Sequence, residues 1–378
     1  MPIDIVYLWV DGNDSVWRTK RQHAANSDSY LNRKLRATYG NVEGRFRDND
    51  ELKFSLRALE LFFPQHGHIY IVTDAQVPLW LKPSNRLTII DHRSLIPTNA
   101  LPTFDSGHIE SYIHRIPNLS ERYFYLNDDM FFGAPVKPED WFYDGGFYVA
   151  WSDEESVVGD CLLQEGQVLA NASRVSKQWL SEKALRNKII PISNLKPNAL
   201  ADQFERLMDP DYRHTPRTFA HAPRPMLKSV LFELEDEAKA LFEKVRSTKF
   251  RSWNTPPIIS DFVHRWALAH KVAAIKEYSH VYISTGDFNA GKQIECLRRS
   301  TEPDARFAGT AARVDFFCIN DTTDDADYFD PRLIAIRLGL KRLFPRASQY
   351  ECESNEERPE EIFANRLTNS HSFYLKTA

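Results

Sequence analysis

The chain has 378 residues, 42% of them hydrophobic and 26% charged, and a formal net charge of −4. This composition is ordinary for a globular protein of one large or two medium domains, and the charge argues against nucleic acid as a partner. The sequence contains no apolar run of about 18 residues, so no membrane span is predicted, and the N-terminus shows no leader pattern. The four cysteines form no CxxC pair. We therefore expect a cytoplasmic protein without a zinc or disulfide framework.

Apolar runs that stop at turn residues predict five strands in residues 1–155. They are Ile3–Val10, His68–Asp74, Leu87–His92, the YFYL run before Asn127, and Gly145–Trp151. Helical spacing of leucines before Pro64 predicts a helix between the first two strands, and a second helix is expected from Ser106 to Pro117. Alternating strands and helices predict an α/β fold with a mainly parallel, doubly wound sheet, as in the core of nucleotide-sugar transferases.

The rest of the chain is expected to complete this core. Residues 156–310 contain helical segments such as LFELEDEAKALFEKV between proline-rich loops, which predicts a helix-rich second lobe for acceptor and catalytic groups. Residues 311–350 return to strand and helix, and residues 351–378 resemble a charged tail. Residues 1–155 would then form the nucleotide-sugar-binding core.

Four of the predicted strands end in carboxylates: Asp11, Asp74, Asp91 and Asp128. In parallel α/β sheets, ligands bind beyond the carboxyl ends of the strands. One acidic strand end is unremarkable, because the chain must turn. Four that converge on one edge predict a binding site there.

The triplet Asn127-Asp128-Asp129 is the most informative of these strand ends, because apolar runs flank it on both sides. A solvated turn with local side-chain hydrogen bonds is one interpretation. The other is that the two carboxylates hold Mg²⁺ or Mn²⁺ against a diphosphate, which would compensate the cost of burying them. We favour this second interpretation.

Other candidate residues remain open between a structural and a functional role. Gly12 either supplies a turn or lets a nucleotide approach the backbone, although neither GxGxxG nor a P-loop motif is present. Arg47, Lys53 and Arg57 either contact phosphate oxygens or pair with nearby carboxylates. His221, in a proline-fixed loop, is either a surface residue or a general base.

Four segments, in order along the chain, resemble the conserved regions of the Stealth family. They are IDIVYLWVDGND; RFRDNDELKFSLRALELFFP continuing to YFYLNDDMFFG; FAHAPRPMLKSVLFELE with FRSW; and FFCINDTTDD. Stealth proteins are similar to bacterial capsule polymerases and to the lysosomal-enzyme N-acetylglucosamine-1-phosphotransferase. The resemblance implies transfer of a hexose-1-phosphate from a nucleotide sugar to a carbohydrate hydroxyl, with formation of a phosphodiester.

The resemblance also implies the site residues. The implied catalytic residues are His221, Arg251, Asp129 and Arg115. The implied substrate-binding residues are Asp11, Gly12, Asn49, Glu51, Arg57, His114, Asn127 and Asn320. The metal ligands would be Asp128, Asp129 and Asp321, with Mg²⁺ or Mn²⁺ as the cofactor.

Two alternatives remain open from the sequence. One is an ordinary metal-dependent glycosyltransferase that releases a nucleoside diphosphate, and the other is a non-catalytic nucleotide-sugar-binding protein. The expected partners are the nucleotide-sugar donor and the carbohydrate acceptor, together with a peripheral association with membrane-bound export machinery. The segment Leu333–Phe344 is either a membrane-contacting amphipathic helix or a packing helix.

Overall fold

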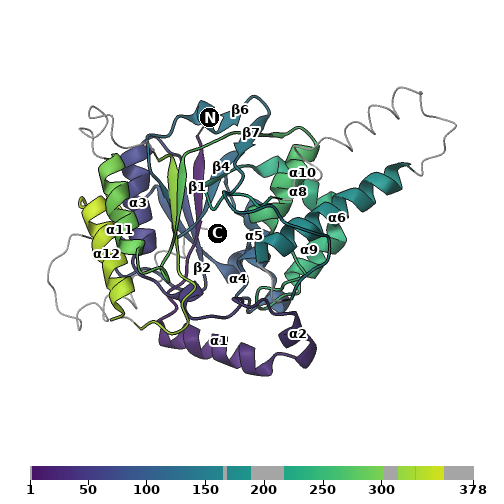
Figure 1. Cartoon of the computed structure of the whole chain (residues 1–378), viewed down its shortest axis with the longest axis horizontal. Coiled ribbons are helices and arrows are strands. Elements are labelled where there is room, and N and C mark those ends of the chain that lie inside the picture. Colours follow the sequence, from purple (N-terminus) through teal and green to yellow (C-terminus); the bar gives the residue numbers. More distant parts are fainter. Residues whose placement is uncertain (1, 165–167, 189–216, 302–313, 328, 353–378) are drawn as a thin grey trace.

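The computed structural model describes residues 2–164, 168–188, 217–301, 314–327 and 329–352. A five-stranded sheet with the order β3-β2-β1-β4-β8 forms its centre (Figure 1). The first four of these strands are parallel and β8 is antiparallel to β4. Their bounds are β1 Asp4–Leu8, β2 Ile69–Thr73, β3 Leu87–Asp91, β4 Arg122–Asn127 and β8 Arg224–Leu227. The predicted α/β fold with a mainly parallel sheet is confirmed.

Two smaller sheets extend this centre. The first has the order β10-β11-β5 and the second β6-β7-β9. The bounds are β5 Met130–Phe132, β6 Phe142–Tyr143, β7 Gly146–Val149, β9 Ala273–Ile275, β10 His280–Ser284 and β11 Phe316–Asn320. Because β4 ends at Asn127 and β5 begins at Met130, the Asp128-Asp129 turn joins the central sheet to the β5 sheet.

Helices cover both faces of the central sheet (Figure 1). One side carries α3 Glu51–Phe62, α11 Ala290–Thr301 and α12 Pro331–Leu343. The other side carries α5 Ser106–Glu110, α6 Val168–Lys188, α8 Lys228–Glu237, α9 Lys239–Arg246 and α10 Val263–Ala269. Three further helices, α1 Ser15–Ser27, α2 Tyr30–Leu35 and α4 His92–Leu95, lie in the lower part of the view in Figure 1.

Two predicted helices show how local sequence determines the outcome. In α3, Leu52, Leu56 and Leu59 recur on one buried face, as the spacing predicts. The helix predicted from Ser106 to Pro117 is shorter: α5 ends at Glu110, and a 3₁₀ turn follows at Ile113–Arg115. The main-chain bonds tighten after Glu110, because the N–H groups of Ser111 and Tyr112 donate to the carbonyl oxygens three residues back, as in a 3₁₀ helix.

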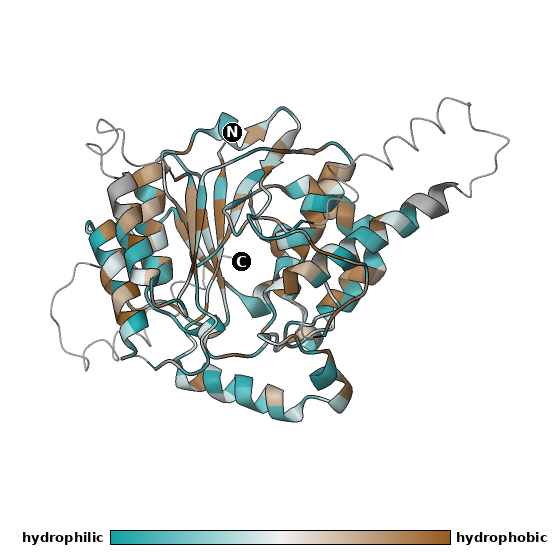
Figure 2. Ribbon diagram, viewed as in Figure 1, coloured by the Kyte–Doolittle hydropathy of each residue, from teal (hydrophilic) through white to brown (hydrophobic). Residues whose placement is uncertain are grey.

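The buried apolar residues of the sheet and helices form one large core cluster, and Figure 2 shows hydrophobic residues concentrated on the central strands. Phe262 and Trp266, from the expected second lobe, belong to the same apolar core as the strands β1 and β4. Residues 156–301 also contribute β8, β9 and β10, so this part is less purely helical than expected. The division into four regions stays a prediction, and residues 353–378 of the expected tail lie outside the described residues.

Helix α12 is a packing helix. Its apolar residues Leu333, Ile336 and Leu340 are buried, and Gly339 lies close against Ile294 of α11. The apolar face therefore contacts protein, which answers the question that the sequence left open for this segment. None of the described helices is both long enough and apolar enough to cross a membrane.

Candidate active site

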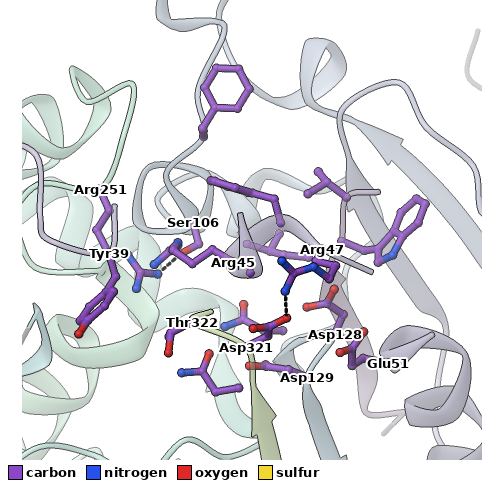
Figure 3. Close-up of a pocket in the computed structure, with 18 of the residues that line it drawn as sticks. Tyr39, Arg45, Arg47, Glu51, Ser106, Asp128, Asp129, Arg251, Asp321 and Thr322 are labelled. Atoms are coloured by element: carbon purple, nitrogen blue, oxygen red, sulfur yellow. Dashed lines mark hydrogen bonds and ion pairs between the residues drawn. The ribbon is translucent and has the colours of Figure 1, made fainter. Parts of the chain in front are cut away.

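A cavity of about 370 Å³ lies at the carboxyl ends of the central strands. Three sets of residues line it: the Asn127-Asp128-Asp129 turn, the short turn Gly44–Phe46 with Arg47, and a wall that includes Ser106 and Arg251 (Figure 3). His221 and the end of β11, at Asn320 and Asp321, complete the polar lining. The strand-end site predicted from the sequence therefore exists as a cavity.

The turn that carries the two carboxylates is held in place by contacts with β11. The carbonyl oxygen of Asp129 accepts a hydrogen bond from the N–H of Ile319 at 2.9 Å, which ties the turn to β11. The Cys318 thiol donates to Asp129 Oδ2 at 3.4 Å. Asp129 Oδ1 is buried and has no partner among the described residues.

Several carboxylates lie close together here, and the protein supplies too few positive charges to neutralise all of them. Burial raises the pKa of Asp129 to about 6, and burial together with the nearby Asp129 and Glu51 charges raises the pKa of Asp128 well above its usual range. Burial and the Asp48 charge raise the pKa of Glu51 to about 8, while burial with Asp50 and Asp11 raises that of Asp48 to about 7. Without a cation, such a cluster retains protons near neutral pH.

Two arginines provide the opposite charge. Arg251 donates to Ser106 Oγ at 2.6 Å, and Arg45, on the turn at Gly44–Phe46, lies in the same cavity on the side of Ser106 and Arg251 (Figure 3). Burial and the Arg251 charge lower the pKa of Arg45 to about 9. The Nε atoms of both arginines are buried without a partner among the described residues. Each is therefore left able to donate to an anionic ligand.

His221 faces the same cavity. Its ring contacts Tyr282 at a centroid distance of 5.3 Å, and its Nδ1 has no partner in the described part of the chain. Burial and the charges of Arg224 and Arg251 lower the pKa of His221 to about 3. The imidazole is therefore neutral at pH 7, and its Nδ1 is left available for a hydrogen bond with a ligand.

The structure brings eight of the predicted site residues to the cavity lining. They are Glu51, Asn127, Asp128, Asp129, His221, Arg251, Asn320 and Asp321. The cavity lining does not include the other six predicted residues, which are Asp11, Gly12, Asn49, Arg57, His114 and Arg115.

Asp321 lines the cavity, but its carboxylate already has protein partners. Its Oδ1 accepts hydrogen bonds from Thr285 and Thr323, and its Oδ2 forms an ion pair with Arg47. The geometry therefore gives no support to Asp321 as a metal ligand. Arg47, which the sequence offered for phosphate, is used in this ion pair.

Gly12 and Asn49 act on the site from behind its lining. The Gly12 N–H donates to Phe46 O at 2.7 Å, and a Cβ at Gly12 would lie 2.1 Å from that oxygen. The close approach that glycine permits is thus made by the turn that carries Arg45, and a nucleotide contact at Gly12 finds no support. Asn49 Nδ2 donates to Glu51 Oε1 at 2.9 Å and holds that carboxylate, while Asp11 Oδ1 caps its own turn through Asn13 N.

Three of the implied basic residues are used elsewhere. Arg57 donates to Glu351 and to the carbonyl oxygen of Phe344, while His114 and Arg115 both contact Glu235. Their predicted contact with substrate in the cavity is therefore not supported. Arg45, by contrast, is a site residue that sequence reasoning missed. Its one signal was its place in the RFR sequence, where Arg47 was chosen instead.

Models of three Stealth conserved regions match this chain: region 1 over residues 1–29, region 2 over 45–149 and region 4 over 310–362. The capsular polysaccharide phosphotransferase fcs1 of Haemophilus influenzae is 30% identical over 338 residues, which cover 87% of this chain and 80% of that protein. The chain belongs to the Stealth family. The resemblance that the sequence suggested is confirmed, whereas the third region, around His221 and Arg251, stays a prediction.

Other Stealth relatives are longer than this chain. An exopolysaccharide phosphotransferase of Streptomyces coelicolor is 30% identical over 359 residues, covering 94% of this chain and 53% of that protein. The exopolysaccharide phosphotransferase CpsY of Mycobacterium tuberculosis is 30% identical over 355 residues, with coverages of 92% and 58%. The chain thus spans about half the length of these relatives.

Solved glycosyltransferase structures are similar only at low scores. The galactosyltransferase LgtC matches with a TM-score of 0.36 and 11% identity, covering 96% of this chain and 99% of that one. Mouse xyloside xylosyltransferase 1 matches with a TM-score of 0.33 and 10% identity, covering 84% and 98%.

Proposed function

We propose that this protein transfers a hexose-1-phosphate from a nucleotide sugar to a carbohydrate hydroxyl, forming a phosphodiester in capsule or exopolysaccharide synthesis. The family supports this, since its relatives here are named capsular and exopolysaccharide phosphotransferases. The observation that carries the proposal is the cavity itself. In it, the carboxylates Asp128 and Asp129 share the lining with Arg45 and Arg251, whose buried Nε atoms have no partner among the described residues.

Asp128 and Asp129 are the residues that would hold Mg²⁺ or Mn²⁺. Carboxylate oxygens suit both ions, and the unpartnered Oδ1 of Asp129 is free to coordinate. Within the described ranges, no three His, Cys, Asp or Glu side chains form a ready-made metal cage. A pair of carboxylates fits the usual manner of binding Mg²⁺, in which substrate phosphates and water complete the coordination. When bound, the ion would neutralise the diphosphate of the donor.

Arg45 and Arg251 would bind the transferring phosphate. Phosphoryl transfer demands mainly positioning and charge stabilisation, and a guanidinium group supplies both through its fixed N–H donors. The Ser106 hydroxyl fixes the Arg251 side chain from one side, so its remaining donors stay oriented toward the cavity. Little reorganisation would then be needed during the reaction.

His221 would accept the proton of the attacking hydroxyl. In this step the acceptor oxygen forms a bond to the phosphorus attached to the donor sugar. The bond from that phosphorus to the nucleoside monophosphate breaks, and the monophosphate leaves with the electron pair. The proton passes to the neutral imidazole of His221, whose low pKa the negative charge of the bound donor would raise by offsetting the charges of Arg224 and Arg251.

The test is to identify the products by ³¹P NMR after incubation with nucleotide sugar, Mg²⁺ and a carbohydrate acceptor. The proposal expects nucleoside monophosphate and a phosphodiester that contains the donor's sugar-linked phosphorus. Release of nucleoside diphosphate would instead establish an ordinary glycosyltransferase. Binding of the donor without turnover by the unmodified protein would establish a non-catalytic binding protein.

We also propose that the protein is cytoplasmic and associates peripherally with the inner face of the membrane, beside export machinery. The chemistry favours it, because nucleotide sugars are the proposed donors and the polymer must be exported. Cell fractionation checks it: the proposal expects the protein in the membrane pellet at low salt and in the supernatant after a high-salt wash. Retention in the pellet at high salt would contradict a peripheral association.

A further inference from the structure

Five cavity residues have a buried polar atom without a partner in the described part of the chain. They are Arg45, His92, Asp129, His221 and Arg251. The proposed transfer uses four of them, for the metal, the phosphate and the proton. His92 Nδ1 has no role in it. An unpaired buried nitrogen costs free energy, so its place in a cavity wall points to a ligand.

His92 lies at the opposite end of the sheet edge from the carboxylates. It directly follows β3, whose last residue Asp91 pairs in register with Thr73 of β2. Asp91 Oδ1 caps the turn by accepting the N–H of Arg93 at 2.7 Å, which fixes the backbone at His92. The His92 side chain is only 2% exposed. It is therefore held in place rather than free to turn toward solvent.

The cavity wall beside His92 is apolar, and the charged Asp74 and Lys20 near its ring pair with each other. Val72 precedes Thr73 on β2 and pairs in register with Leu8 of β1, and both residues line the cavity together with Val10 and Ile109. The cavity arginines come from other segments, at Gly44–Phe46 and at Arg251. Burial lowers the pKa of His92 to about 4, so the ring is neutral and carries one donor and one acceptor.

We propose that His92 binds the nucleobase of the donor nucleotide, an inference that rests on the proposed use of a nucleotide sugar. A base has apolar faces and a polar edge, which match the apolar walls and the single unpaired nitrogen. A phosphate would find no cation among these wall residues, and a ribose would leave a second hydroxyl unpaired. From β3 to β4 the sheet crosses three strand spacings, roughly 14 Å at about 4.8 Å each, a span that an extended nucleoside diphosphate can cover.

The experiment compares ligands with and without a base. Calorimetric titrations in Mg²⁺ use ADP, GDP, CDP and UDP, with inorganic pyrophosphate as the base-free probe. For His92→Ala, we expect the preferred nucleotide to bind about tenfold more weakly, because one hydrogen bond and its pocket are lost. Pyrophosphate affinity should change by less than about twofold. His92→Asn should recover part of the nucleotide affinity, since an amide keeps a donor and an acceptor.

His66→Ala is the matched control. His66 is similarly buried, at 3% exposed, and burial likewise lowers its pKa to about 4, but it lies before β2, at the amino end of the sheet. Its loss should lower the melting temperature and leave nucleotide affinity unchanged. Parallel melting curves show whether each variant is folded under the titration conditions.

Equal weakening of nucleotide and pyrophosphate in folded His92→Ala would overturn the inference, and so would no weakening of either. These results would leave the proposed transfer intact. If the wild-type protein binds no nucleotide, the proposed function and the inference both fail. If it binds nucleotide through His92 but releases nucleoside diphosphate in turnover, only the proposed bond cleavage fails.

Discussion

The charged residues of the cavity and those around Glu235 differ in how far they are paired within the protein. At Glu235, on α8, three bases share one carboxylate: His114 Nε2 lies 2.6 Å from Oε2, while Arg115 and Arg246 contact Oε1 at 2.8 and 2.5 Å. Burial alone would raise the pKa of Glu235, but the hydrogen bonds from these three residues hold it well below its usual range. In the cavity, by contrast, guanidinium, imidazole and carboxylate atoms remain without partners in the described chain.

This difference separates charges that hold the fold from charges that are left for a ligand. The family resemblance implied His114 and Arg115 as well as Arg251, and the contacts with Glu235 distinguish the first two from the third. The Glu235 cluster joins α8 and α9 to the turn after α5, and Arg246 extends it through Ser111. Loss of a cavity residue should therefore lower the activity of a protein that stays folded. Loss of a Glu235 contact should instead lower the stability of a protein that stays active while folded.

The largest effect is expected for Asp129→Asn. The amide removes one charge from the proposed metal site, so we expect kcat/KM to fall by about 10³-fold. The melting temperature without divalent cations should stay the same or rise, because a buried charge is removed from a repulsive cluster. Product formation by ³¹P NMR and a thermal melt measure the two effects. Full activity in the variant would remove Asp129 from the proposed site.

The next effect is expected for Arg251→Lys. Lysine keeps the charge but loses the fork of N–H donors, and it cannot reach both Ser106 Oγ and a phosphate in the same way. We expect kcat/KM to fall by about 10- to 100-fold. Arg86→Lys is the matched control, since Arg86 donates to His66 O outside the cavity. Equal losses in both variants would show a general effect of arginine removal rather than a site effect.

Glu235→Gln should affect stability and leave the chemistry alone. It leaves three bases without their shared counter-charge, so we expect the free energy of unfolding to fall by about 2 kcal/mol. At a temperature where the variant is folded, kcat/KM should change by less than about threefold. Denaturant melts and steady-state kinetics measure the two quantities. A 100-fold loss of activity with unchanged stability would place His114 and Arg115 in the active site after all.

The sequence predicted the parts of this molecule that depend on local patterns. Apolar runs ending in polar residues identified four parallel strands, and the same pattern placed Asp128 and Asp129 at a strand end. In a parallel sheet, strand order hardly matters for such a prediction, because all the carboxyl ends meet at one edge.

Residues chosen by tertiary contacts could not be predicted in this way. Both arginines of the RFR sequence line the cavity, but Arg47 is used by Asp321, which is far along the chain and pairs with it. The fit of Gly12 under Phe46 O then sets the turn that carries Arg45. His92 was missed for a related reason: as the last residue of an apolar run it resembled part of the strand, and only the fold shows its unpaired Nδ1 in a cavity wall.

The smallest expected effect is a pair of opposite pH dependences in metal-free protein. The pKa values of Asp129, Asp48 and Glu51 are raised to about 6, 7 and 8, so the folded state binds more protons than the unfolded state through this range. Their contribution to stability is fully present below about pH 4 and is lost as the pH rises from there to about 8. The pKa of Glu235 is lowered, so its contribution is present above about pH 4.5 and is lost as the pH falls further.

Thermal melts between pH 3 and 9 should therefore show a maximum near pH 4, with each group that titrates changing the stability by about 1 kcal/mol per pH unit. Asp129→Asn should flatten the alkaline limb and Glu235→Gln the acid limb, so each variant tests its own region. Mg²⁺ should raise the melting temperature more at pH 8 than at pH 5, because it competes with protons for the carboxylates. Stability that rises from pH 6 to 8 without a divalent cation would mean that the cavity carboxylates are neutralised within the protein, and the contrast between the two regions would then fail.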